Sequence, residues 1–313
     1  MKIVVIEPLG VAQEKLQNTA KEIIGDRADI IYYQTKTTDS AELSDRAKDA
    51  DIIVVSNLPL KREVLENCPK LKMISVAFTG VDHIAMDYCK EKGITVSNCA
   101  GYSTKSVSEL VFGMLLCLYR NIIKCDEAVR NGGTKDGLVG NEISGKKFGI
   151  VGTGAIGLKT AAIAQAFGCE VYAYSRTQKQ VDGITYLPLD KLMSECDIIS
   201  LHVPLTEQTK GLINAEKIAL MKKSAVLVNT ARGPVVDSEA LSAALKDGKI
   251  AGACIDVFEN EPPVAKGHPL LNCPNVVATP HVAFATKEAM EVRAGMVFEN
   301  VSAYLDGKPI NVM

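Results

Sequence analysis

Residues 147–157 read KFGIVGTGAIG, an apolar run that ends in a G-x-G-x-x-G turn. The small residues of 158–167 favour a helix after the turn, and the apolar segment 170–174 favours a second strand. In such a unit one glycine permits the turn, one lets a pyrophosphate approach the backbone, and one allows close packing of helix on strand. The unpaired amides at the helix start attract phosphate. We therefore predict a dinucleotide-binding site at Gly152, Gly154, Ala155, Ile156 and Gly157.

Composition narrows the class of protein. A chain of 313 residues is long for one domain, so two domains are expected. The net charge of −2, with no long run of one sign, argues against nucleic acid and anionic membranes as partners. No segment approaches the roughly 18–20 apolar residues of a membrane span, and the N-terminus does not resemble a signal peptide. Nine scattered cysteines without a C-x-x-C pair favour a reducing, cytoplasmic location and suggest no metal site.

The first hundred residues alternate short apolar runs with helix-compatible segments, which is typical of a doubly wound α/β unit. This part contains no glycine-rich phosphate loop, so we assign it to substrate binding. The expected strands are 3–6, 30–33, 52–56, 73–77 and 94–96, and the expected helices are 14–24, 43–50 and 61–67.

The alternation resumes after a helical segment, 103–130, whose wide apolar face makes it a candidate subunit interface. Six further strands complete a dinucleotide-binding sheet, and a last helix, 286–305, is expected to pack on the first domain. The predicted fold is α/β, with two doubly wound parallel-sheet (Rossmann-like) domains and a cleft between them. The domains are 1–98 with 287–313, and 99–286; the six strands are 148–151, 170–174, 198–203, 225–229, 253–257 and 276–279.

Three loops of the second domain carry residues suited to chemistry. Arg232, Glu261 and His281 each follow a predicted strand, and ligands bind at the carboxyl ends of parallel strands. Arginine can bind a carboxylate through two hydrogen bonds, histidine can transfer a proton near neutral pH, and a carboxylate behind the histidine orients it. Taken singly, each has a structural alternative: a strand-end cap, a solvated turn residue and an ordinary turn histidine.

The motifs GIVGTGAIG, HVPLTEQT, LVNTARGPVVD, ACIDVFENEPP and NVVATPHVAFAT occur in one order along the chain. In this set and order the sequence resembles the D-isomer-specific 2-hydroxyacid dehydrogenases, which include glycerate, phosphoglycerate and glyoxylate/hydroxypyruvate enzymes. The resemblance covers essentially the whole chain. It implies hydride transfer between a nicotinamide and C2 of a small 2-oxo or 2-hydroxy acid. It also implies that Arg232 binds the substrate carboxylate, that His281 is the acid–base residue, and that Glu261 tunes His281.

The same resemblance extends to further contacts. It implies that backbone amides of the first domain grip the substrate carboxylate, and that several residues of the second domain line the coenzyme. The implied substrate contacts are Thr79, Gly80 and Val81, and the implied coenzyme contacts are Thr104, Val203, Pro204, Thr209, Thr230, Ala231 and Asp256. For Asp256, a helix cap or a surface carboxylate is the alternative interpretation.

One departure from the family pattern concerns the coenzyme. Members that prefer NAD end the second strand of the unit in an acid that binds the ribose hydroxyls. Here Ser175, Arg176 and Thr177 occupy this position. Without the negative charge a 2′-phosphate is not repelled, and these side chains could bind it. The sequence therefore favours NADP(H), with NAD(H) or dual use left open; Arg176 could instead lie over the adenine or in solvent.

The resulting hypothesis is a cytoplasmic, homodimeric reductase of a small 2-oxo acid. Glyoxylate, hydroxypyruvate and slightly larger acids all remain admissible. Two alternatives use the same fold: a coenzyme-sensing interaction protein similar to corepressors, and a dehydrogenase of formate or phosphite.

Overall fold

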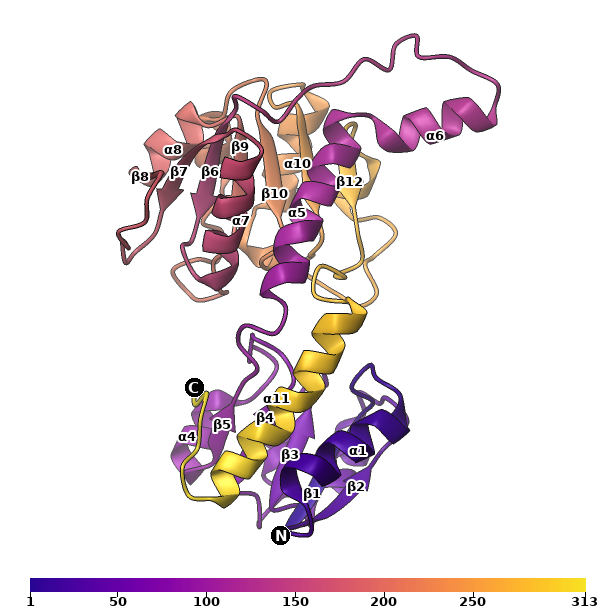
Figure 1. Ribbon diagram of the computed structural model, residues 1–313, viewed down its shortest axis with the longest axis vertical. Coiled ribbons are helices and arrows are strands. Elements are labelled where there is room, and N and C mark those ends of the chain that lie inside the picture. The colour runs from indigo at the N-terminus through magenta and orange to yellow at the C-terminus, as the bar shows by residue number, and fades with distance from the viewer. The chain divides into compact units, whose positions relative to one another are not determined.

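The computed structural model describes all 313 residues, which form two compact units. The first comprises Met1–Ser103 and Ala285–Met313, and the second comprises Thr104–Phe284. The chain therefore leaves the first unit at Ser103, runs through the whole second unit, and returns to the first at Ala285. Both units are parallel sheets covered by helices, which confirms the predicted α/β class (Figure 1).

The first unit has a five-stranded parallel sheet in the order β2-β1-β3-β4-β5. Two of the three interior strands, β3 and β4, are buried along their whole length, as expected for apolar strands with helices on both faces. The strands are β1 (Lys2–Val5), β2 (Asp29–Tyr32), β3 (Ile52–Val55), β4 (Met73–Val76) and β5 (Thr95–Ser97). The helices are α1 (Gln13–Ile24), α2 (Ser40–Ala47), α3 (Arg62–Leu65), α4 (Met86–Lys92) and α11 (Lys287–Leu305).

The last helix, α11, packs against α1 and β4 within this unit (Figure 1). Thr286 caps its first turn by accepting a hydrogen bond from the amide of Ala289. The Ser75 hydroxyl of β4 donates to the carbonyl of Val297, which fixes the helix on the sheet. The sequence placed this helix on the first domain, and the structure shows this packing.

The second unit has a seven-stranded parallel sheet in the order β12-β11-β10-β9-β6-β7-β8. The prediction of six strands was wrong, because it missed β8. This edge strand is three residues long and only partly buried, so it lacks the apolar run that marked the others. The strands are β6 (Lys147–Val151), β7 (Glu170–Tyr174), β8 (Ile184–Tyr186), β9 (Ile198–Leu201), β10 (Val226–Asn229), β11 (Gly252–Ile255) and β12 (Val276–Ala278).

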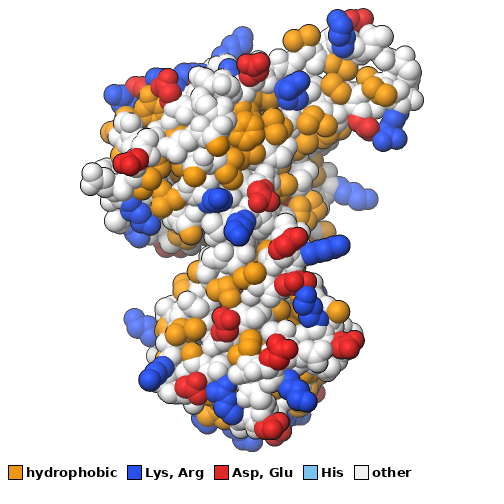
Figure 2. Space-filling view, in the orientation of Figure 1, with side chains coloured by type: hydrophobic (Ala, Val, Ile, Leu, Met, Phe, Trp, Pro, Cys, Tyr) orange, Lys and Arg blue, Asp and Glu red, His pale blue; other side chains and the backbone are white.

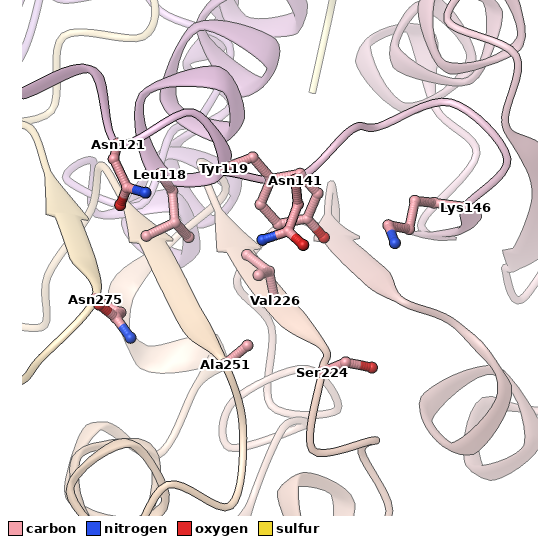
Figure 3. A pocket seen from close by; sticks show the side chains of 9 residues that line it. All are labelled: Leu118, Tyr119, Asn121, Asn141, Lys146, Ser224, Val226, Ala251 and Asn275. Carbon is pink, nitrogen blue, oxygen red and sulfur yellow. The ribbon is translucent and has the colours of Figure 1, made fainter. Parts of the chain in front are cut away.

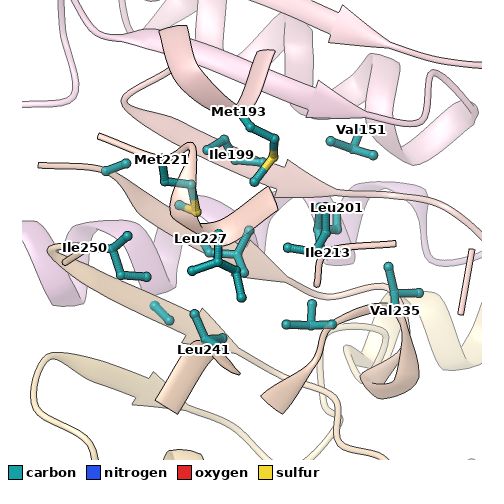
Figure 4. Packing of buried hydrophobic residues seen from close by; sticks show 14 of the residues in the cluster. Val151, Met193, Ile199, Leu201, Ile213, Met221, Leu227, Val235, Leu241 and Ile250 are labelled. Atoms are coloured by element: carbon teal, nitrogen blue, oxygen red, sulfur yellow. The ribbon is translucent and has the colours of Figure 1, made fainter. Parts of the chain in front are cut away.

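Two apolar cores lie on the two faces of this sheet. On one face α5 and α7 lie side by side over β6 and β10, and on the other α8, α9 and α10 cover the sheet around Leu227 (Figure 4). The helices are α5 (Thr104–Tyr119), α6 (Ile122–Arg130), α7 (Ala155–Ala166), α8 (Leu189–Glu195), α9 (Ala215–Ala219) and α10 (Ser238–Lys246), with short 3₁₀ turns at Gly233–Val235 and Pro269–Asn272. The strand order reverses beside β6, so the glycine turn lies at the topological switch point of the sheet.

Residues 103–130 are mostly helical, as predicted, but the segment is divided into two helices. Two helices, α5 and α6, meet at an angle of 55°. Asn121 lies between them in the left-handed region with a φ of 51°, which a straight helix does not contain. No single helix is long and apolar enough to cross a membrane, and the bent α5–α6 pair meets that criterion by length and composition only.

Candidate active site

Three neighbouring strands bring the predicted catalytic residues to one edge of the sheet. The last residues of β10, β11 and β12 are in register, Asn229 opposite Ile255 and Ile255 opposite Ala278. Because the strands are parallel, the loops that carry Arg232, Glu261 and His281 leave the same edge side by side. The sheet topology thus places the three residues of the hypothesis on adjacent loops.

His281 and Glu261 form a direct pair. His281 Nδ1 lies 2.6 Å from Glu261 Oε1, and the two side chains are 27% and 15% exposed. The other carboxylate oxygen, Oε2, accepts a hydrogen bond of 3.1 Å from the amide of Phe258, which fixes the carboxylate. With Nδ1 held in this way, the proton that can be exchanged with a ligand is on Nε2. The ring of Phe284 packs edge-on against the imidazole and limits its rotation.

A buried carboxylate builds the turn on which His281 lies. Asp256 is fully buried, and its Oδ1 accepts from the Thr279 hydroxyl (2.6 Å) and the Val282 amide (2.9 Å). Its Oδ2 accepts from the Ala283 amide at 2.9 Å, and its carbonyl accepts from the His281 amide at 2.7 Å. Burial raises the pKa of Asp256, and these hydrogen bonds oppose that rise. His281 has a φ of 53°, so the turn is strained, and Asp256 holds it in place.

This role of Asp256 was missed by the sequence analysis, which placed it only beside the coenzyme. The signal that could have found it is an acid at the end of a buried strand, where a carboxylate must be hydrogen-bonded to be stable. Its partners come from the next strand's loop, which no local pattern identifies.

Arg232 is held by a second polar brace. Asn229, at the end of β10, accepts from the amide of Ala231 and donates to the carbonyl of Arg232. Gly233 follows, and a Cβ at this position would lie 2.0 Å from the carbonyl carbon of Phe258. The loop of Arg232 therefore contacts the loop that carries Glu261, and only a glycine fits at the contact.

The glycine turn has the geometry expected of a pyrophosphate site. Gly152 has a φ of 102°, and a Cβ there would lie 2.6 Å from the carbonyl oxygen of His202. A Cβ on Gly157 would lie 2.0 Å from the carbonyl oxygen of Gly152. Gly154 is the N-cap of α7, has no side chain to cap the helix, and has no atom within 4 Å of the position of its missing Cβ. The first amides of α7 are thus open to an anion.

Other predicted coenzyme contacts differ in what they can offer. The Thr230 hydroxyl is buried without a hydrogen-bond partner, which suits a polar group of a bound ligand. The Thr209 hydroxyl already donates to the carbonyl of Pro204, beside Val203, and so shapes that loop. Arg176, between Ser175 and Thr177 after β7, is exposed and forms no salt bridge within the protein. These observations fit a nicotinamide dinucleotide.

The remaining predicted residues lie at the start of the second unit and in the first unit. Thr104 is the first residue of α5, and Thr79, Gly80 and Val81 follow β4 at the carboxyl edge of the first sheet. No group of three or more His, Cys, Asp or Glu side chains in the 313 residues could hold a metal ion.

A pocket of about 240 Å³ lies at the opposite edge of the second sheet (Figure 3). It is lined by Tyr119 and Asn141 and by residues that precede or begin strands, such as Lys146 and Ala251. Because the glycine turn and the three loops follow the other ends of the strands, this pocket is separate from the candidate active site.

Comparison with known proteins identifies the family. Residues 112–283 match the family "D-isomer specific 2-hydroxyacid dehydrogenase, NAD binding domain". The chain belongs to this family. It is 35% identical to a hydroxypyruvate reductase of Blautia hydrogenotrophica, over 100% of this chain and 99% of that protein. It is 41% identical to a glyoxylate reductase of Thermococcus litoralis, over 84% of this chain and 82% of that protein.

Solved structures agree with this assignment. An acyclic imino acid reductase in complex with NADPH and D-Arg matches with a TM-score of 0.91 and 32% identity over 100% of both chains. A D-lactate dehydrogenase from Aquifex aeolicus, complexed with NAD and lactic acid, matches with a TM-score of 0.84 and 33% identity, covering 98% of this chain and 96% of that one. The predicted family and the enzymatic nature of the chain are thereby confirmed. The coenzyme of this D-2-hydroxyacid dehydrogenase is a nicotinamide dinucleotide, and both NADPH and NAD occur in the related structures.

The glycine turn yields a matched pair of variants. Gly157→Ala should lower the free energy of unfolding by about 1–3 kcal/mol, since its methyl group overpacks the contact with Gly152. Gly154→Ala has room for its methyl group and should unfold like the wild type, but should bind NADH and NADPH more weakly because the methyl group covers the phosphate position. Urea denaturation and coenzyme fluorescence titration measure the two effects. Unchanged coenzyme affinity in Gly154→Ala would show that the phosphates lie elsewhere.

Proposed function

We propose that this dehydrogenase works as an NADP(H)-dependent reductase of small 2-oxo acids such as glyoxylate and hydroxypyruvate, forming the 2-hydroxy acid, in the D configuration where C2 becomes a stereocentre. The His281–Glu261 pair carries this proposal, since it stands at the same sheet edge as the glycine turn with its Nε2 available. The names of the relatives, hydroxypyruvate reductase and glyoxylate reductase, support the substrate class. They favour an enzyme over the corepressor-like alternative.

In this proposal the residues of the three loops divide the work. The guanidinium of Arg232 binds the substrate carboxylate and polarises the neighbouring carbonyl. When bound, the reduced nicotinamide supplies the hydride to C2. The protonated imidazole of His281 donates the Nε2 proton to the carbonyl oxygen, so that hydride and proton together convert the oxo group to a hydroxyl. Glu261 stabilises the imidazolium and holds the ring.

The first unit supplies the second half of the carboxylate site in this proposal. The amides of Gly80 and Val81 donate no hydrogen bond within the protein, so they are open to a carboxylate. This assigns substrate binding to the predicted segments 1–98 and 287–313, and coenzyme binding to 99–286. The nine free cysteines, most of them buried, support a reducing cytoplasm as the compartment.

The proton donor and its partner can be separated by mutation. His281→Ala should lower kcat for reduction by about 10²- to 10⁴-fold, the usual contribution of a general acid. Glu261→Gln should keep measurable turnover at a lower kcat, because the amide replaces the carboxylate that holds His281 Nδ1. Steady-state rates of the two variants and the wild type measure both effects.

His268→Ala is the matched control, since it removes the other histidine–carboxylate pair of this unit, that with Glu259. It should leave kcat within a few-fold of wild type. Full turnover in His281→Ala would overturn the assignment of the proton donor.

The coenzyme preference is tested by measuring the reduction of glyoxylate, hydroxypyruvate, pyruvate and a 2-imino acid with NADPH and with NADH. Formate and phosphite are tested as hydride donors in the reverse direction. The wild type should reduce 2-oxo acids with NADPH at the higher kcat/KM. Arg176→Ala should lower the ratio of kcat/KM with NADPH to kcat/KM with NADH about 10- to 100-fold, the factor for hydrogen bonds of about 1.5–3 kcal/mol to a charged group. Lys179→Ala, a nearby cation, is the control. A wild type that prefers NADH would contradict the 2′-phosphate assignment.

The α5–α6 region is proposed to bind a second copy of the chain. No residue of α6 is buried, and its apolar side chains Ile123 and Val129 are 61% and 76% exposed. Apolar side chains also gather along α6 and over the region of α5 (Figure 2). An exposed apolar surface of this kind marks an association site. A homodimer would cover it.

Ile123→Glu should convert the dimer to a monomer because it places a charge in the apolar contact. Lys124→Glu, which changes the charge of the neighbouring exposed residue, should leave the dimer intact. Light scattering coupled to size-exclusion chromatography gives the mass of each. A wild type that elutes as a monomer at micromolar concentration would contradict the proposal.

A further inference from the structure

A chain of asparagine side chains leads from the C-terminal tail to the loop after β4. Asn98 Nδ2 donates to the carbonyl of Thr79 at 2.7 Å. Asn300 Nδ2 donates to the carbonyl of Asn98 at 2.8 Å, and Asn311 Nδ2 donates to Asn300 Oδ1 at 2.8 Å. These residues lie after β5, on α11 and in the tail, so three separate segments of the first unit are connected.

The inner members of this chain are shielded from water. Asn300 is fully buried and Asn98 is 5% exposed, so a missing partner could not be replaced by solvent. Asn98 Oδ1 also accepts from the amide of Ala100. Each bond therefore has a fixed direction, and the loss of one would leave its buried partner unpaired.

The outer member is fixed by the backbone of the tail. Asn311 has a φ of 52°, and its carbonyl accepts from the amide of Asn98 at 3.0 Å. The amide of Met313 donates to the carbonyl of Val96, and the Ser97 hydroxyl donates to the carbonyl of Ile310. The tail thus runs along β5, and the left-handed turn at Asn311 lets its side chain reach Asn300.

The carbonyl at the end of this chain belongs to a peptide with a functional amide. The carbonyl of Thr79 and the N–H of Gly80 lie in one planar trans peptide and point in opposite directions. Holding the carbonyl against Asn98 therefore aims the Gly80 N–H away from Asn98. The amide of Gly80 donates no hydrogen bond within the protein, so its direction is set by the peptide plane that Asn98 holds, and the amide of Val81 follows in the next peptide.

The start of the same loop is anchored separately. The carbonyl of Phe78 accepts from the amide of Cys99, and its ring packs edge-on against Tyr102 with 6.2 Å between centroids. The buried guanidinium of Arg293, on α11, lies over both rings at 5.2 and 5.6 Å. Phe78 is therefore placed by packing, and the next peptide is placed by the asparagine chain.

We propose that Asn98, Asn300 and Asn311 are positioning residues that aim the Gly80 amide, and with it the loop that carries the Val81 amide, at the substrate carboxylate, so that the C-terminal tail sets the affinity for the 2-oxo acid. This inference rests on the proposed function of the Thr79–Val81 loop. Small errors in placing a carboxylate relative to its donors lower both binding and rate. All three asparagines belong to the first unit, whereas the proposed coenzyme site belongs to the second, so coenzyme affinity is expected to stay as in the wild type.

Asn311→Gly removes one bond of the chain with little other change. Asn311 is exposed, and glycine adopts its left-handed backbone freely, so the variant should fold. The KM for the 2-oxo acid should rise about two- to tenfold, the factor for one hydrogen bond, while kcat changes less than twofold and the Kd for NADPH is unchanged. A purely structural role would lower the active fraction and kcat, and would leave KM as it is.

Asn98→Asp tests the inner bond more severely. It keeps the acceptor for Ala100 but sets a carboxylate oxygen against the carbonyl of Thr79, so KM should rise more than tenfold. The matched control for Asn311→Gly is Asn275→Gly, which makes the same substitution in the second unit at an exposed residue with a φ of 54°. Its side chain makes no hydrogen bond in the structure, and its KM should equal that of the wild type.

Hydrogen exchange distinguishes this inference from the function on which it rests. In Asn311→Gly, peptides covering residues 78–82 should exchange faster than in the wild type, while peptides of the second unit are unchanged. Should the wild type reduce no 2-oxo acid, the proposed function fails, and hydrogen exchange alone decides whether the three asparagine side chains hold the loop after β4. Should the wild type be active and Asn311→Gly keep both its KM and its exchange rates, the positioning role is overturned.

Discussion

The register of β10, β11 and β12 is the constraint on which the chemistry of this protein depends. Parallel strands that end level with one another deliver their loops to one edge, and the hydrogen bonds of the ladder fix which residues face across it. A shift of one strand by one residue would reverse its inward and outward side chains and displace its loop. The apolar cores on both faces of the sheet oppose such a shift, because β10 and β11 contribute buried side chains and β12 contributes the partly buried Val276 and Val277. The strand ends from which the three loops leave are thus fixed by the packing of the core.

The loops themselves are held by buried polar side chains at strand ends. Asp256 accepts hydrogen bonds from the turn of His281, and Asn229 donates to the carbonyl of Arg232. Asn98 donates to the loop after β4. Glu7 does the same beside β1, where its Oε1 accepts from the amides of three consecutive residues after β3, Ser56, Asn57 and Leu58. A loop cannot satisfy its own backbone groups as a helix does, and a buried partner that is lost leaves them unpaired. Both units therefore use the same device to give irregular backbone a single conformation.

The features that the sequence revealed are those set by local spacing. The tight turn at Gly152 and the close packing at Gly157 follow from a short motif and are present in the structure, while phosphate binding at Gly154 stays a prediction. Strand ends were predictable to within a few residues, because apolar runs end where loops begin. The features that could not be predicted depend on distant partners or on weak patterns. They are the polar edge strand β8, the break at Asn121, and the hydrogen bonds of Asp256 and Asn98 to other loops. Their partners lie in other loops, so spacing along the chain carries no sign of them.

Geometry separates two histidine–carboxylate pairs that the sequence alone makes equivalent. His268 Nε2 lies 2.8 Å from Glu259, and its Nδ1 accepts from the amide of Leu270, so both ring nitrogens are engaged within the protein. His202 is enclosed beside Ser200, and burial lowers its pKa to about 3, so it stays neutral. His281 alone of the three combines a carboxylate on one nitrogen with a second nitrogen left for a ligand. In the proposed reaction a proton donor must present its transferable proton to the substrate, and of these three histidines only His281, on the turn held by Asp256, has a ring nitrogen left for this.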